Sequence, residues 1–214
     1  MIIEEIMKTD IHTLAPDDTI AAALQLCRDH KVRHIPILNE EGLLVGLVTD
    51  RDIKDATPSI LKKEYGADEL NKPLSLIMKK NVITGHPLDF VEDVAATFYE
   101  HSISCLPVVQ HNEVIGLVTE TDVLNTFVEL TGVHQPGSRI EIRVENKAGV
   151  LFEILQVMHR RRVNVQSVLV YPDRDEAYKV IVLRIRTMNP VGVVDDLKKA
   201  GHDVLWPNMP GVCT

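Results

Sequence analysis

The sequence GLVTDRDI at residues 46–53 returns as GLVTETDV at residues 116–123, and this repeat decides the organisation of the chain. Upstream of it, IMKTDIHTL from Ile6 aligns with IMKKNVITG from Ile77 at a shift of 71 residues, which one deletion reduces to 70. Matches on both sides of a single gap indicate two copies of one unit of about 50 residues. A unit this small buries too little apolar surface alone, so we expect the two copies to pack together.

Each copy predicts the same elements in the same order. An extended piece precedes a helix, in which apolar residues recur at the i, i+3, i+4, i+7 spacing of one buried face. Two strands follow as continuous apolar runs, which is typical of strands covered on both faces, and then a closing helix. The extended pieces are 11–13 and 82–84, the strands are 35–38, 44–49, 106–109 and 114–119, and the closing helices begin at Asp50 and Glu120.

The T-x-x-D sequence between the last strand and the closing helix has two interpretations. In the first, the threonine (Thr49 or Thr119) caps the helix and the aspartate three residues later reaches back to it, which is a capping box. In the second, the turn binds a nucleotide. The helix N-terminus and the hydroxyl suit a phosphate, and the carboxylate of Asp52 or Asp122 accepts both hydroxyls of a ribose. The residues alone leave both interpretations open.

This turn, preceded by an h-P-h strand (IPI at 35–37, LPV at 106–108) and repeated in tandem, resembles a pair of CBS motifs, the unit called a Bateman module. In that family the clefts bind adenosine compounds such as AMP, ADP, ATP or S-adenosylmethionine. The resemblance implies that the aspartates hold ribose hydroxyls, the threonines lie near the phosphate and the apolar–proline pairs flank the adenine. Arg51 would contact a phosphate, where the second copy has Thr121. The implied nucleotide-binding residues are Ile35, Pro36, Thr49, Arg51, Asp52, Leu106, Pro107, Thr119 and Asp122.

From Ser138 the pattern changes to strand, helix, strand, strand, helix, strand. Residues 139–145 alternate apolar and polar side chains, as a half-buried strand does, and Asn146 is expected to cap the helix that follows. Asn189 and Pro190 are expected to cap and start the second helix.

The βαββαβ order, with NKAGVL at the first strand–helix turn, resembles an ACT domain. In that family this turn often meets an amino-acid effector at a dimer interface. The implied effector-binding residues are Asn146, Gly149, Val150 and Leu151. In the alternative interpretation, Gly149 only allows the helix to pack closely on the sheet. This alternative stays open because a fold alone does not establish a function.

These resemblances predict a mixed α/β chain, with a first CBS motif at 1–60, a connecting stretch at 61–76, a second CBS motif at 77–132 and a ferredoxin-like ACT domain at 138–210. Tandem CBS motifs followed by an ACT-like domain resemble the acetoin-utilisation proteins of the AcuB type over essentially the whole chain. That resemblance implies a role in growth on acetoin or butanediol and in sporulation.

Composition and charge argue against several classes of function. The net charge is −8, and residues 1–137 hold 11 basic against 22 acidic residues, which disfavours nucleic-acid binding. No apolar run approaches the roughly 18 residues of a membrane helix. The opening MIIEEIMKTD lacks the order of a secretion signal, so we expect a cytoplasmic protein without membrane contact.

Metal binding and catalysis are not expected either. His30 and His34 align with His101 and Cys105, but the second residue of each pair directly precedes a strand, so the chain leaves the helix between them. Cys105 is instead expected to line the adenine pocket. The sequence contains no G-x-S-x-G, H-E-x-x-H, Walker or G-x-G-x-x-G motif.

The leading hypothesis is therefore a non-catalytic sensor that requires no cofactor and binds an adenosine nucleotide as its regulatory ligand. The ligand would bias the domains or a homodimer and so control a partner protein, with Phe127, Val128 and Leu130 as dimer contacts. Two alternatives stay open: an enzyme or enzyme subunit of acetoin breakdown, and a structural scaffold with empty clefts.

Overall fold

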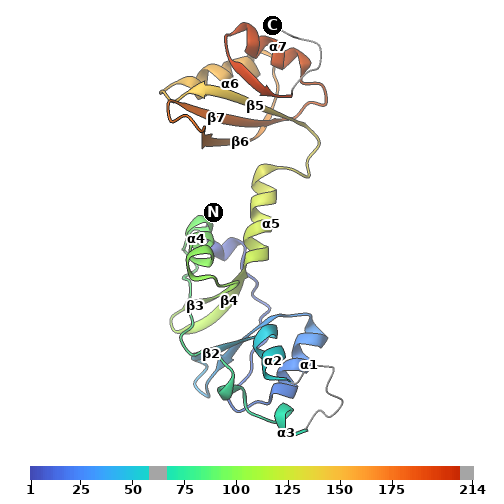
Figure 1. Cartoon of the computed structure of the whole chain (residues 1–214), viewed down its shortest axis with the longest axis vertical. Helices are drawn as coiled ribbons and strands as arrows, with labels where there is room; N and C mark the ends of the chain where they lie inside the picture. The colour runs from blue at the N-terminus through green and yellow to red at the C-terminus, as the bar shows by residue number, and fades with distance from the viewer. Residues whose placement is uncertain (58–66, 208–214) are drawn as a thin grey trace. The chain divides into compact units, whose positions relative to one another are not determined.

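The chain divides into two compact units, Met1–Leu124 and Asn125–Thr214, and the division falls within α5 (Glu120–Thr131). The computed structural model describes residues 1–57 and 67–207 (Figure 1). Residues 58–66, at the junction of the expected first motif and connecting stretch, lie outside the described residues, as do residues 208–210 of the expected ACT domain and Cys213. Each unit has its own hydrophobic core and is described separately below.

In the first unit, both copies have the order helix, strand, strand, helix that their sequences predict. Thr19 caps the first helix by accepting a hydrogen bond from the Ala22 N–H at 3.2 Å. The first copy comprises α1 (Ile20–His30), β1 (His34–Leu38), β2 (Leu44–Thr49) and α2 (Asp50–Ala56). The second comprises α4 (Val91–His101), β3 (Cys105–Gln110), β4 (Glu113–Thr119) and α5, and the short helices are η1 (Ile3–Glu5), α3 (Ala67–Leu70) and η2 (Leu74–Leu76).

The two strands of each copy form an antiparallel hairpin, and the two hairpins share one register. The proline of each h-P-h strand lies opposite the leucine of G-L-V-T, and a bulge follows at the equivalent position of each hairpin. The prolines are tolerated because both strands of a two-stranded sheet are edge strands. The extended pieces expected at 11–13 and 82–84 belong to no named helix or strand of the described residues, and Leu14 and Gly85 just after them each make a single parallel bridge to a hairpin.

The two copies exchange the segments that lead into them. Met7, which precedes the first copy in sequence, packs against the core of the second copy, and Met78 packs against the core of the first. The backbone follows the same exchange, since Lys8 pairs with β4 and Lys79 pairs with β2. The expected packing of the copies is confirmed, and it takes the form of an interlocked exchange.

This exchange explains the glycine that begins each G-L-V-T sequence. A Cβ atom on Gly46 would lie 2.6 Å from the Met78 sulfur, and one on Gly116 would lie 2.7 Å from the Met7 sulfur. Only a residue without a side chain lets the exchanged methionine lie this close to the strand. Gly46 and Gly116 therefore make room for the methionines through which the two copies interlock.

The second unit is a βαββαβ domain with one four-stranded antiparallel sheet in the order β6-β7-β5-β8. Alternate residues of β5 (Ile140, Ile142 and Val144) are buried with apolar residues of the helices, as the alternation predicts. The elements are β5 (Ser138–Glu145), α6 (Val150–Arg160), β6 (Val165–Pro172), β7 (Tyr178–Ile185), α7 (Val191–Lys199) and β8 (Asp203–Trp206). None of the helices in residues 1–57 and 67–207 is long and apolar enough to cross a lipid bilayer.

Two helix starts in this unit differ from the prediction. Asn146 does not cap α6, which begins one residue after Gly149. Gly149 has a φ of 88°, and a Cβ atom on it would meet nothing within 4 Å, so its backbone conformation explains this glycine and close packing does not. At α7 the N-cap is Pro190, and Asn189 accepts a hydrogen bond from the Val191 N–H at 3.1 Å.

Candidate functional site

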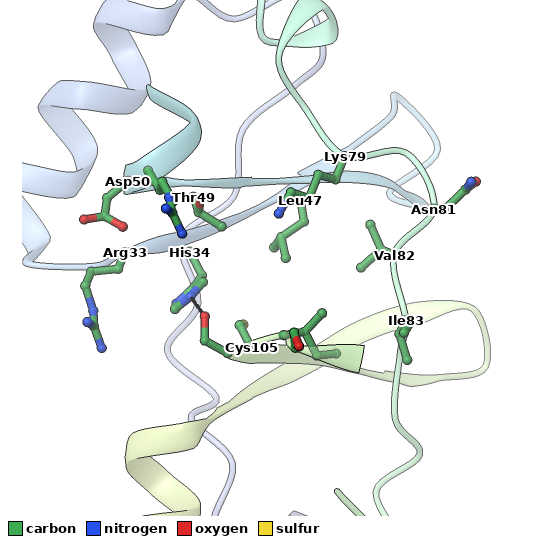
Figure 2. Close-up of a pocket in the computed structure, with 14 residues that line it drawn as sticks. Arg33, His34, Leu47, Thr49, Asp50, Lys79, Asn81, Val82, Ile83 and Cys105 are labelled. Carbon is green, nitrogen blue, oxygen red and sulfur yellow. Dashed lines mark hydrogen bonds between the residues drawn. The ribbon is translucent and has the colours of Figure 1, made fainter. Parts of the chain in front are cut away.

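A cavity of about 300 Å³ lies between the two copies of the first unit (Figure 2). This volume is at the lower end of the range for small-molecule pockets. The first copy contributes Arg33, His34, Leu47, Thr49, Asp50 and Arg51, the segment after η2 contributes Lys79, Asn81, Val82 and Ile83, and the second copy contributes Ser102, Ile103, Ser104 and Cys105. The cavity thus exists only because the two copies interlock.

Positive charge predominates among the residues that line the cavity. Arg33, Arg51 and Lys79 provide three cations, and Asp50 is the one carboxylate among the lining residues. Asp50 already pairs with the ammonium group of Lys54 at 2.9 Å, and this hydrogen bond lowers the pKa of Asp50. An anionic ligand would therefore meet an excess of positive charge among the residues that line the cavity.

The turn beside the cavity is a capping box, as the first interpretation predicts. The backbone N–H of Thr49 donates to Asp52 Oδ2 at 2.8 Å, and the Thr49 hydroxyl donates to the same oxygen at 2.6 Å. In return, the Asp52 N–H donates to Thr49 Oγ1 at 3.2 Å. Among the described residues no hydrogen bond reaches Asp52 Oδ1, so capping leaves one carboxylate oxygen for a ligand.

The equivalent turn of the second copy repeats the capping and adds an ion pair. The Thr119 N–H donates to Asp122 Oδ2 at 2.9 Å, while Lys8 Nζ lies 3.0 Å from Asp122 Oδ1. Asp122 is only 9% exposed. The two turns therefore share their geometry and differ in the partner of the outer carboxylate oxygen.

A polar contact joins the two copies at the cavity wall. His34 Nε2 and Ser104 Oγ are 3.0 Å apart, as the dashed line in Figure 2 marks. Burial, followed by the positive charge of Arg33, lowers the pKa of His34. Burial raises the pKa of the neighbouring Cys105 thiol to about 12, so this thiol stays protonated at neutral pH.

The structure brings some of the predicted nucleotide-binding residues to this cavity and places others elsewhere. Thr49 and Arg51 line it, and so does Cys105. Ile35 and Leu106 are 0% and 2% exposed, so their side chains belong to the cores of the two copies. The predicted residues that do not line the cavity are Ile35, Pro36, Asp52, Leu106, Pro107, Thr119 and Asp122.

Eleven of the fourteen residues that line the cavity are absent from the sequence prediction, among them Arg33, His34, Lys79 and Ser104. The repeat could have pointed to Arg33 and His34. Arg33 and His34 directly precede the h-P-h strand, and they align with Ser104 and Cys105 at the same shift of 71 residues. Lys79 has no such local signal, because it reaches the cavity through the exchange of segments.

The residues of the predicted effector site do not gather in one cavity. Asn146 lines a depression beside β6, and Val150 is buried in the core of the second unit but borders a different cavity. Leu151 is half-buried against the same core, and Gly149 is exposed at the turn. Binding of an effector at this turn stays a prediction.

The histidine pairs do not share a helix face. The helix α1 ends at His30, Lys31 follows with a φ of 55°, and His34 lies in β1. Among residues 1–57 and 67–207 the structure contains no group of three His, Cys, Asp or Glu side chains arranged to hold a metal ion.

Known protein families match both units. The CBS domain matches residues 3–59 and 74–129, and the ACT domain matches residues 138–202. The CBS domain-containing protein YhcV of Bacillus subtilis is 33% identical over 121 residues, which cover 56% of this chain and 81% of YhcV. In several other curated relatives the matched region spans between 23% and 51% of their length.

Two solved structures are similar to the first unit. The CBS domain pair of protein MJ0100, in complex with 5′-methylthioadenosine and S-adenosyl-L-methionine, is 30% identical with a TM-score of 0.53, and the match covers 60% of this chain and 97% of that one. An AcuB-type acetoin utilization protein from Vibrio cholerae is 26% identical with a TM-score of 0.54, over 63% and 96% of the two chains. The two CBS matches together cover more than half of the sequence, and the chain belongs to the CBS domain family, with an ACT domain after the tandem CBS pair.

Proposed function

We propose that this chain is a non-catalytic regulatory protein that binds an adenosine nucleotide in the cavity between its CBS copies. The observation that carries the proposal is the cavity itself, which three cations line and to which Thr49 and Arg51 of the T-x-x-D turn contribute. The similar CBS pair solved with 5′-methylthioadenosine and S-adenosyl-L-methionine supports an adenosine compound as the ligand.

Each part of the ligand has a chemical counterpart at the site. Asp52 does not line the cavity, but it follows Arg51 in the same turn, and its Oδ1 would accept hydrogen bonds from the ribose hydroxyls. Such charge-assisted bonds are stronger than neutral ones. The guanidinium group of Arg51 would pair with a phosphate, for which its planar donors are well suited. The apolar side chains of Val82, Ile83 and Ile103 would contact the adenine.

The finer part of the proposal concerns what the ligand controls. Occupation of the cavity would shift the population of a conformation that a partner protein recognises, since a ligand acts through its different affinities for two states. The similarity to an AcuB-type acetoin utilization protein supports a role in acetoin or butanediol utilisation. We extend that role to sporulation on the basis of the same AcuB resemblance.

The test is isothermal titration of the full chain with AMP, ADP, ATP and S-adenosylmethionine, accompanied by thermal unfolding with each compound. We expect saturable heat with at least one of them and a rise in melting temperature, because a ligand that binds the native state stabilises it by mass action. No heat and no thermal shift with any compound would contradict nucleotide binding. Turnover of acetoin by the purified chain would establish the enzyme alternative instead.

A further inference from the structure

Lys8 and Lys79 occupy the same place in the two copies. Each follows the methionine of an I-M-K sequence, 71 residues apart. Each also makes two backbone hydrogen bonds to the second strand of the opposite copy: Lys8 bonds with Leu117 at 2.9 Å in both directions, and Lys79 bonds with Leu47 at 3.0 Å in both directions. The two lysines therefore have equivalent backbone positions in the two copies.

The two side chains nevertheless have different partners. Lys8 Nζ lies 3.0 Å from Asp122 Oδ1, whereas Lys79 forms no ion pair with any of the described residues and lines the cavity (Figure 2). The carboxylate that corresponds to Asp122 in the first copy is Asp52, whose Oδ1 accepts no hydrogen bond from the described residues.

The neighbouring charges account for this difference. Arg33 and Arg51 line the same cavity as Lys79, so their guanidinium groups would compete with its ammonium group for a carboxylate. At the aligned positions the second copy has the neutral residues Ser104 and Thr121. It also retains an acidic residue, Glu120, at the start of the helix, so Lys8 enters a negative field and pairs with Asp122.

We propose that the two equivalent lysines have opposite roles: Lys8 is the permanent occupant of the second turn, whereas Lys79 is a phosphate-binding residue of the first. The inference rests on the proposed function and deepens it. It predicts one nucleotide per chain, bound in the first cavity. It also predicts a ligand that carries phosphate groups, because three cations attract phosphates and repel the sulfonium of S-adenosylmethionine.

The second turn is a poor site for such a ligand for two reasons. A ribose would have to displace the ammonium group of Lys8, which is 61% exposed, from a carboxylate that is only 9% exposed. On the buried carboxylate side the ion pair is screened less than between two exposed groups. A phosphate there would meet Glu120 and no arginine at the position of Arg51.

Calorimetric titration of the full chain tests the inference with four ligands: ATP, AMP, 5′-methylthioadenosine and S-adenosylmethionine. The wild type should bind one ATP per chain, and the affinity should fall in the order ATP, AMP and then the two compounds without phosphate. Lys79→Met should weaken ATP binding at least tenfold and change the affinity for 5′-methylthioadenosine less than twofold. The matched variant Lys8→Met should leave the ATP affinity within twofold of the wild type.

Three outcomes would overturn the inference while leaving the proposed function intact: two ATP molecules per wild-type chain, equal loss of ATP affinity in Lys8→Met and Lys79→Met, or tighter binding of S-adenosylmethionine than of ATP. Absence of binding by all four compounds would overturn the proposed function as well. The wild-type stoichiometry and ligand order decide the question even if Lys8→Met does not fold, and Lys79 is exposed, so its replacement leaves the core intact.

Discussion

Asp52 uses its two carboxylate oxygens differently. Oδ2 accepts both hydrogen bonds from Thr49 and closes the capping box, while Oδ1 stays available to a ribose. In Asp52→Asn, the amide oxygen can still accept the capping bonds, so we expect a stability cost of about 1 kcal/mol or less. The amide nitrogen would then face the ligand and cannot accept a bond. Nucleotide affinity should fall at least about tenfold, because one bond to a charged group is worth roughly 1.5–3 kcal/mol and 1.4 kcal/mol is a factor of ten.

Asp122→Asn is the matched control for this prediction. It removes the partner of Lys8 at a carboxylate that is only 9% exposed, so it should lower the melting temperature. It should leave the nucleotide affinity unchanged. Titration and thermal unfolding of both variants give the comparison. Similar losses of melting temperature with unchanged affinity in both would mean that the two aspartates are helix caps and nothing more.

His34 makes the stability of the first unit depend on pH. Burial, followed by the charge of Arg33, lowers the pKa of His34 below the usual value of about 6.5. The unfolded chain then takes up a proton at a higher pH than the folded chain. The stability that the neutral His34 contributes is therefore fully present above about pH 6.5, and this contribution is lost as the pH falls through the lowered pKa.

Thermal unfolding between about pH 7 and pH 5 measures this effect across the range in which histidine titrates. His34→Gln should flatten the decline of the melting temperature, since glutamine can still bond to Ser104 and does not titrate. His111→Gln, in the exposed turn between β3 and β4, serves as the control and should keep the wild-type slope. Identical slopes in the two variants would contradict the assignment to His34.

At the scale of elements, the two G-L-V-T glycines should differ in their tolerance of a side chain. A Cβ atom on Gly116 meets the backbone oxygen of Lys8 at 3.0 Å as well as the sulfur of Met7. The three atoms nearest to a Cβ atom on Gly46 all belong to the flexible Met78 side chain. We expect Gly116→Ala to cost about 1–3 kcal/mol and Gly46→Ala to cost less, because a backbone oxygen cannot rotate away. Urea unfolding followed by circular dichroism measures both, and a larger loss in Gly46→Ala would refute this account of the interlock.

The elements of each copy were predictable from the sequence, whereas their exchange was not. Apolar spacing shows which face of a helix or strand is buried, and α1, α4 and the two hairpins agree with it. Spacing does not show what buries that face. Met7 and Met78 carry the same local pattern whether they pack on their own copy or on the other one. Asn146 failed as a cap for a related reason: its propensity was favourable, but the left-handed Gly149 set the start of α6.

The candidate site divides in the same way. Thr49 and Arg51 belong to a local motif, so the sequence alone identified them. Lys79 and Ser104 come from segments distant from that motif and reach the cavity only through the interlocked fold. The T-x-x-D pattern does not distinguish capping from ligand binding, because both require an acceptor at the same position. Only the geometry shows that the cap does not use Oδ1 of Asp52.

At the scale of the whole molecule, we expect a homodimer. Phe127 and Leu130 of α5 are 56% and 57% exposed, and exposed apolar side chains that lie close together often mark protein contacts. Light scattering at micromolar concentration should give twice the mass of the chain. Phe127→Asp combined with Leu130→Asp should shift the protein to a monomer, while Met188→Asp, at a residue 79% exposed in the second unit, should not. A monomeric wild type would contradict the dimer.

Hydrogen–deuterium exchange of the full chain with and without saturating ATP tests the central claim most directly, since it reports both whether a nucleotide binds and where. The cavity is built from four separate stretches, so we predict slower exchange at residues 33–34, 47–51, 79–83 and 102–105 together. The second turn at residues 119–122 should be unaffected, because Lys8 already occupies it. Unchanged exchange in all four stretches at saturating ATP, or protection confined to residues 138–207, would contradict a nucleotide site between the two CBS copies.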